Sequence, residues 1–120
     1  MSNTPEIIPF GKRSVRLVTM NGVAKFAATD ICNILGYSKP NKILGRTCNS
    51  TPEYIRLDTP GGVQNVRMID IEDIFDILEH CRSRNAKQFR KWIEETVIPY
   101  LMLRMRPVAE PIVIISLGTY

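Results

Sequence analysis

The fold of this chain is decided by residues 14–37, SVRLVTMNGVAKFAATDICNILGY. Apolar side chains fall on alternate positions in Ser14–Met20, which is typical of a half-buried β-strand. Asn21-Gly22 separates this run from Val23–Phe26, and Asn-Gly is a strong hairpin signal because both turn positions need positive φ. In Ala27–Leu35 the apolar spacing becomes i, i+3, i+4, i+7. These patterns predict a β-hairpin followed by a helix.

Short elements of both kinds are predicted to follow. Gly36 can end the first helix in the left-handed conformation that glycine tolerates. A second short helix then runs through Lys42–Thr47, which makes a helix–turn–helix-like pair. Two more strands, Glu53–Asp58 and Gln64–Ile69, are joined by a turn at Thr59–Gly62, where proline and glycine favour chain reversal.

The C-terminal part is predicted to be helical. Asp70 can cap a helix over Ile71–Arg82, and a longer helix covers about Ala86–Met105, with Pro99 expected to kink or divide it. The inner face of the last helix is predicted to hold Phe89, Trp92, Ile93, Val97, Tyr100 and Leu101. The order ββ-αα-ββ-αα predicts an α+β domain of small antiparallel β-hairpins packed against helices.

The two ends of the chain are predicted to differ from this domain. Met1–Pro9 has the character of a loose arm, and the domain is expected to occupy residues 1–106. Residues 107–120 form a C-terminal tail that contains the short β-prone run Ile112–Ile115. This tail could form an extra edge strand, an exchange arm or a disordered end, and a homodimer is one expected consequence.

The composition describes one globular domain. The chain has 120 residues, 44% of them apolar, and a formal charge of +4. No stretch approaches the roughly 18–20 apolar residues that a membrane helix needs. Cys32, Cys48 and Cys81 are odd in number and widely spaced, which favours reduced thiols in a cell interior. We therefore expect a cytoplasmic protein without a membrane partner.

The sequence offers little for catalysis. His80 is the single histidine and lies near the end of an amphipathic helix, where a surface histidine that compensates the helix dipole is the simpler interpretation. Cys81 points about 100° away from it around the helix axis, so the two do not face each other as a nucleophile and its base. Asp73 and Asp76 could bind Mg²⁺ only with further ligands, and a solvated acidic face is the simpler interpretation. We expect no enzymatic activity, no cofactor and no metal.

Positive charge is gathered in two clusters. The first basic cluster is Lys39, Lys42 and Arg46, a stripe on the second short helix. The second basic cluster lies in a segment with five bases and no acid, and its predicted phosphate contacts are Arg82, Arg84, Lys87 and Arg90. Two i, i+4 pairs, Arg90 with Glu94 and Lys91 with Glu95, would reduce part of this charge.

An aromatic side chain in the turn between the two short helices is a further candidate. Tyr37 could stack on a nucleic-acid base. A tyrosine at a helix end that packs over the core is the simpler interpretation.

Three blocks of the sequence form a recognisable set: Phe26–Pro40 (FAATDICNILGYSKP), Leu57–Gln64 (LDTPGGVQ), and Phe89–Ile93 (FRKWI) with the following Val97–Pro99 (VIP). Together they resemble the Bro-N domain, the N-terminal domain of baculovirus Bro proteins and of phage and prophage antirepressors. The likeness extends over Ile7–Leu103. It implies a DNA-binding role in viral or prophage regulation. Phage members often carry a second, C-terminal domain, so this chain is expected to be a stand-alone or shortened member.

Two functional hypotheses follow. In the first, the chain is a DNA-binding module of viral or prophage origin, a transcription regulator or antirepressor-like protein, whose two basic clusters contact phosphates. In the alternative, it is a protein-interaction module that captures a repressor or another basic partner through Asp73, Asp76 and Glu79, with DNA binding incidental. Either would act in the host cytoplasm, or in the nucleus for a eukaryotic virus.

Overall fold

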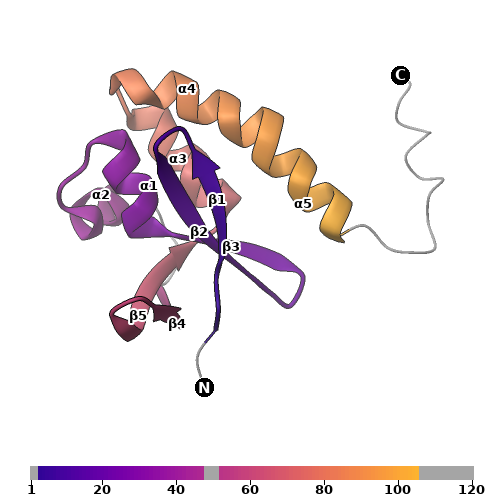
Figure 1. Ribbon diagram of the computed structural model, residues 1–120. Coiled ribbons are helices and arrows are strands. Elements are labelled where there is room, and N and C mark those ends of the chain that lie inside the picture. Colours follow the sequence, from indigo (N-terminus) through magenta and orange to yellow (C-terminus); the bar gives the residue numbers. More distant parts are fainter. Residues whose placement is uncertain (1–2, 48–51, 106–120) are drawn as a thin grey trace.

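The structure, a computed structural model, describes residues 3–47 and 52–105 and contains one five-stranded antiparallel sheet in the order β1-β2-β3-β5-β4 (Figure 1). The strands are β1 (Glu6–Phe10), β2 (Arg13–Met20), β3 (Val23–Ala27), β4 (Glu53–Thr59) and β5 (Gly62–Ile69). The helical elements are α1 (Ala28–Leu35), α2 (Pro40–Thr47), α3 (Ile71–His80), α4 (Arg84–Trp92), the π-helical turn η1 (Ile93–Val97) and α5 (Ile98–Met105). The α+β class is therefore confirmed.

Residues 14–37 form the predicted hairpin and helix. Asn21 and Gly22 have φ angles of 52° and 78°, the positive values that a two-residue hairpin turn requires. Gly36 ends α1 with φ of 88°, and the Tyr37 amide donates to the Cys32 carbonyl at 2.8 Å. This bond fixes the direction in which the chain leaves α1, and so fixes the backbone of Tyr37.

The N-terminal segment is not the loose arm that the sequence predicts. Glu6–Phe10 pairs with β2, and Asn3 bridges to Leu57 in β4. Because β1 and β4 are the two edges of the sheet, this segment connects both edges. The sequence signal is weak because Ile8 is the one fully buried side chain of β1, and because Pro9 is tolerated in an edge strand.

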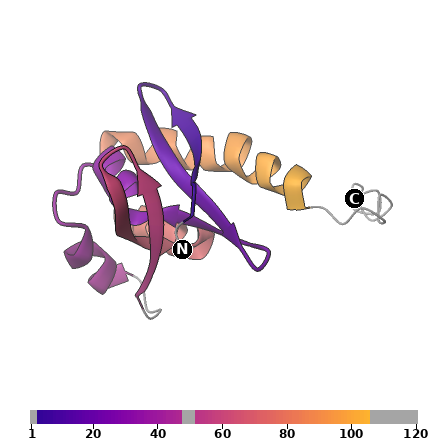
Figure 2. The same ribbon diagram turned by 60° about the horizontal axis from the view of Figure 1, so that its bottom comes forward.

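Two separate apolar clusters hold the fold together. The larger one combines side chains of the sheet with side chains from every helical element. The smaller one contains strand residues alone: Val18, Ala27, Ile55, Leu57, Val66 and Met68. Leu17 and Val18 lie in different clusters because successive side chains of a strand point to opposite faces. Figure 2 shows the β4–β5 hairpin in front of the other strands and the α4–η1–α5 helix behind them.

The last helix is divided, as Pro99 predicts. The Ile98 amide donates to the Ile93 carbonyl, a five-residue step that defines the π turn before Pro99. The extra residue accommodates a proline that lacks an amide hydrogen and crowds the preceding turn. Tyr100 is not a core residue as predicted: it is 38% exposed, and its hydroxyl donates to Glu6 of β1.

Helix ends also differ from prediction. The helix capped by Asp70 ends at His80 rather than Arg82, because Cys81 is already extended. The next helix begins at Arg84, ahead of the predicted Ala86, since Ser83 provides a cap. The predicted tail at residues 107–120 and its run Ile112–Ile115 lie outside the described residues, as does Cys48. Among the described residues, no helix is long and apolar enough to span a membrane.

Candidate nucleic-acid interface

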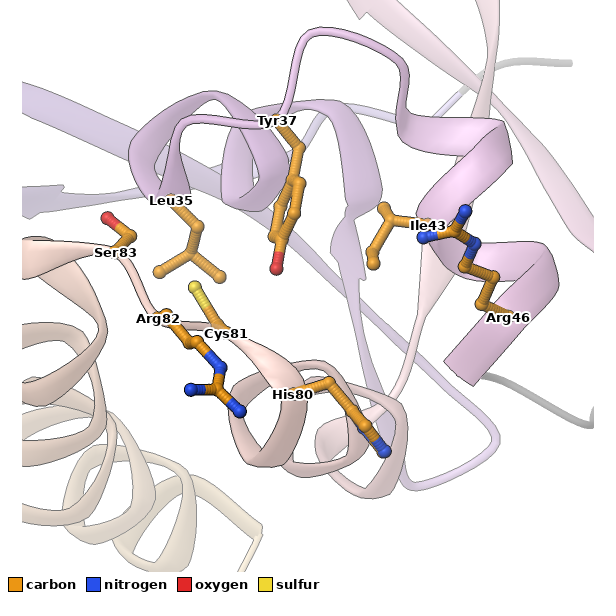
Figure 3. Close-up of a pocket in the computed structure, with 8 residues that line it drawn as sticks. All are labelled: Leu35, Tyr37, Ile43, Arg46, His80, Cys81, Arg82 and Ser83. Atoms are coloured by element: carbon orange, nitrogen blue, oxygen red, sulfur yellow. The ribbon is translucent and has the colours of Figure 1, made fainter.

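A pocket of about 460 Å³ lies where three segments that are distant in the sequence come together (Figure 3). The end of α1 and the following turn contribute Leu35 and Tyr37, and α2 contributes Ile43 and Arg46. The end of α3 and the connection to α4 contribute the remaining lining residues: His80, Cys81, Arg82 and Ser83. The pocket therefore brings together one arginine from each predicted basic cluster.

The lining of this pocket is mixed, with apolar side chains grouped around Tyr37 and with polar groups from Arg46, His80, Arg82 and Ser83. Figure 3 shows the Tyr37 ring between Leu35 and Ile43, with the hydroxyl directed toward the Cys81 sulfur. Desolvation by burial, followed by the hydrogen bond with Cys81 and the nearby Cys81 and Cys32 thiols, raises the pKa of Tyr37 to about 12. The hydroxyl is therefore neutral at physiological pH. The tyrosine packs against the core, as the simpler interpretation of the sequence has it, while one part of it lines the pocket.

His80 lies at the margin of the pocket and has a defined orientation. Its Nδ1 atom is 3.0 Å from the Asp76 carbonyl oxygen, which can only accept a hydrogen bond. Nδ1 therefore carries the proton, and Nε2 is left on the exposed side of the ring. This matches the surface histidine predicted at the end of an amphipathic helix.

The start of α4 is held in place by side chains beside the pocket. The Ser83 hydroxyl accepts from the Asn85 amide at 3.1 Å, which caps the helix. The Asn85 side chain donates to the Ile34 carbonyl at 2.8 Å. Because Ile34 belongs to α1, this bond fixes the start of α4 against α1. The side chains of the second basic cluster thus project from an anchored backbone.

The first basic cluster is exposed on an anchored helix. Lys39, Lys42 and Arg46 all point to solvent, whereas Ile43 and Leu44 between them are buried in the main core. The buried pair fixes the helix and leaves the cations available to a ligand.

The second basic cluster is also exposed, with one exception. Arg82, Arg84 and Lys87 are exposed, but Arg90 is half-buried, with its guanidinium carbon 5.5 Å from the Phe75 ring centroid. Within the described part of the chain, the salt bridges are Arg16–Asp30 and Lys25–Glu53. The predicted pairs of Arg90 and Lys91 with the glutamates one turn later do not form, because the π turn that follows changes the rotation of the helix.

The acidic helix is less exposed than its sequence indicates. Asp73 is only 9% exposed and forms a capping box with Asp70 at the start of α3. The Asp73 amide donates to the Asp70 carboxylate at 2.9 Å, and the Asp70 amide donates back to Asp73 at 3.3 Å. Asp76 is half-buried and Glu79 is exposed. Asp73, one of the three predicted partner contacts, therefore has a structural role at the start of α3.

The pocket itself is a feature that sequence reasoning misses. Its cationic residues are recognisable in the sequence, but their convergence depends on how α2 packs against α3. Asn85 is missed as well: an amide side chain beside a helix start gives no sign of a partner in α1. Only the general need of the last helical carbonyls for donors hints at such a bond.

Comparisons with known proteins give one family. The family model described as BRO family, N-terminal domain (Bro-N) matches residues 14–99. An uncharacterized protein of Haemophilus influenzae is 29% identical over 79 residues, which are 63% of this chain and 38% of that protein. The matched segment thus spans well under half the length of this relative. No solved structure matches the chain.

Proposed function

Because this chain belongs to the BRO family through its N-terminal domain, which matches over residues 14–99, we propose that it binds DNA to regulate transcription in a virus or prophage. The family is associated with phage and viral DNA-binding regulatory proteins. The proposal includes an antirepressor-like role inside the host cell. The domain works as a binding module without catalysis.

The observation that carries this proposal is the convergence of the two basic clusters at one pocket. Arg46 and Arg82 line the same cavity, although they lie far apart in the sequence. Neither has an acidic partner within the described part of the chain. Cations without internal partners, held on anchored helices, are what contact with a polyphosphate backbone requires.

The remaining members of the clusters extend this surface along two helices. Lys39 directly precedes α2 and Lys42 lies on it with Arg46, whereas Arg84 and Lys87 lie on α4, after Arg82 in the connection. We assign phosphate contacts to these six side chains. Arg90 is a weaker candidate because its guanidinium lies over Phe75. Phosphate contacts of this kind fix the orientation of a protein on the duplex.

The test is the salt dependence of duplex binding. Binding of a labelled duplex should weaken between about 50 and about 200 mM salt, with log K falling by about 0.9 per contacted phosphate for each decade of salt. The double variant Arg46→Gln, Arg82→Gln should lower this slope by about 1.8. A matched control, Lys12→Gln with Arg56→Gln, removes the same charge from exposed positions on the β1–β2 turn and on β4.

Two results would contradict the proposal. The first is no detectable duplex binding at about 50 mM salt. The second is an equal loss of slope in the control variant, which would mean that only net charge matters. Capture of a basic repressor is tested separately, because Glu79→Lys should then abolish capture and leave duplex binding intact.

A further inference from the structure

Phosphate contact alone leaves the interior of the pocket unexplained. Its walls are Leu35, Ile43, Cys81 and the ring of Tyr37, whereas its cations stand at the margin (Figure 3). A bare phosphate would meet the arginines and leave the apolar walls uncovered. A purely apolar ligand would have no use for the charge. The ligand that fits both has an anionic end and a flat, largely apolar body.

We propose that this pocket binds one nucleotide, with its base against Tyr37 and its phosphate between Arg46 and Arg82. This rests on the proposed function and adds to it, because the nucleotide is an unpaired residue of a DNA strand or a free mononucleotide. The volume of about 460 Å³ falls within the range of roughly 300–1,000 Å³ of small-molecule sites.

Tyr37 is prepared for this role by its surroundings. Its amide is bonded to the Cys32 carbonyl, its ring packs against the main core, and its hydroxyl is directed toward the Cys81 sulfur, so the ring has a defined position. A fixed aromatic ring loses little conformational freedom when a base stacks on it. Because the hydroxyl stays neutral, it places no negative charge beside an incoming phosphate.

The margin supplies donors in several directions. Arg46 comes from α2 and Arg82 from the α3–α4 connection, so the two approach from different elements. His80 lines the same pocket, but its Nδ1–H donates to the Asp76 carbonyl and Nε2 of that tautomer accepts, so the donors to an anion are the two arginines. The anionic group of the ligand therefore belongs at the mouth and its base in the interior.

The experiment compares two labelled duplexes that differ by one unpaired nucleotide. The unpaired position carries 2-aminopurine, whose fluorescence reports stacking. We expect binding about tenfold tighter than to the fully paired duplex, the size of one base stacked on an aromatic ring, together with a change in fluorescence. Free dAMP, added as competitor, distinguishes a mononucleotide from a residue within a strand.

Variants of Tyr37 test whether the preference for the unpaired nucleotide arises in the pocket. Tyr37→Leu keeps an apolar side chain but removes the aromatic face, and should abolish the preference while paired-duplex binding stays within about twofold. Tyr37→Phe should retain the preference. Tyr54→Leu is the matched control, because Tyr54 is 56% exposed on β4. If Tyr37→Leu does not fold, the wild-type preference for the unpaired nucleotide and its fluorescence change decide.

The outcomes separate this inference from the proposed function. Equal affinity for both duplexes, with neither a fluorescence change nor competition by dAMP, overturns the nucleotide pocket and leaves duplex binding intact. Competition by dAMP without a preference for the unpaired nucleotide supports the pocket with a free mononucleotide as its ligand. Absence of binding to either duplex at low salt overturns the proposed function, and dAMP binding then tests the pocket by itself.

Discussion

The ion pair between Arg16 and Asp30 is expected to be a principal link between the sheet and α1. Two bonds join the side chains, from Arg16 Nε at 2.8 Å and from Nη2 at 2.9 Å. The Arg16 backbone amide donates a third bond to the same carboxylate at 3.0 Å. The pKa of Arg16 is raised by the hydrogen bond and by the charge of Asp30, against the opposing effect of burial. The pair therefore stabilises the charged form of the guanidinium.

The size of this contribution follows from its burial. The two side chains are 23% and 17% exposed, so the pair lies between a surface ion pair and a buried one. Surface pairs contribute about 0.2–1 kcal/mol, whereas breaking a buried pair costs about 3–5 kcal/mol. For a bidentate pair at this depth we expect a coupling energy of about 2 kcal/mol. A loss of about 2 kcal/mol corresponds to a melting temperature lower by about 8 °C, at about 2.1 cal/mol/K of unfolding entropy per residue.

A double-mutant cycle with Arg16→Met and Asp30→Asn measures the coupling by urea denaturation. The matched control is the cycle of Lys25→Met and Glu53→Gln, because that pair has a single contact of 3.0 Å and Glu53 is 47% exposed. Its coupling should be below about 1 kcal/mol. An Arg16–Asp30 coupling below about 0.5 kcal/mol, or one equal to that of the control, would refute the reasoning from burial and geometry.

Two further predictions concern Tyr37 in the pocket and Trp92 at the end of α4. Because the pKa of Tyr37 is raised from 10.0 to about 12, its contribution to stability is complete below pH 10 and is lost as the pH rises toward 12. The unfolding free energy should fall less steeply over that interval in Tyr37→Phe, and an equal fall in both proteins would contradict this. Trp92→Phe removes the indole bond to the Pro9 carbonyl, 3.0 Å long, and should cost about 1 kcal/mol in urea denaturation followed by circular dichroism. Unchanged stability would show that water replaces this bond.

Local signals made most of the fold predictable. The Asn21-Gly22 turn, the Asp70 cap and the Pro99 interruption each act within a few residues, so the sequence contains the whole cause. β1 could not be predicted in this way. Its pairing with β2 and the bridge of Asn3 to β4 depend on contacts with distant strands, and its own apolar pattern is short.

In the candidate site, too, some features follow from local sequence and others from contacts between distant segments. The two basic clusters are visible in the sequence, since charge is a property of the residues themselves. Their convergence at Arg46 and Arg82 depends on tertiary packing and is visible only in the structure. Asp73 is a different case, because its spacing from Asp70 matches a capping box and could have indicated a structural role.

The fold separates cations that stabilise the structure from cations that remain for a ligand. On the strands, Arg16 and Lys25 are paired with acids from other elements. On α2 and beside the pocket, Arg46 and Arg82 have no such partner in the described part of the chain. α3 has acids at its start and His80 at its end, an order that its dipole favours and that keeps its first-turn carboxylates a helix length from the pocket. The two ion pairs are each electrically neutral, so the net charge of +4 belongs to the residues outside them, Arg46 and Arg82 of the pocket included.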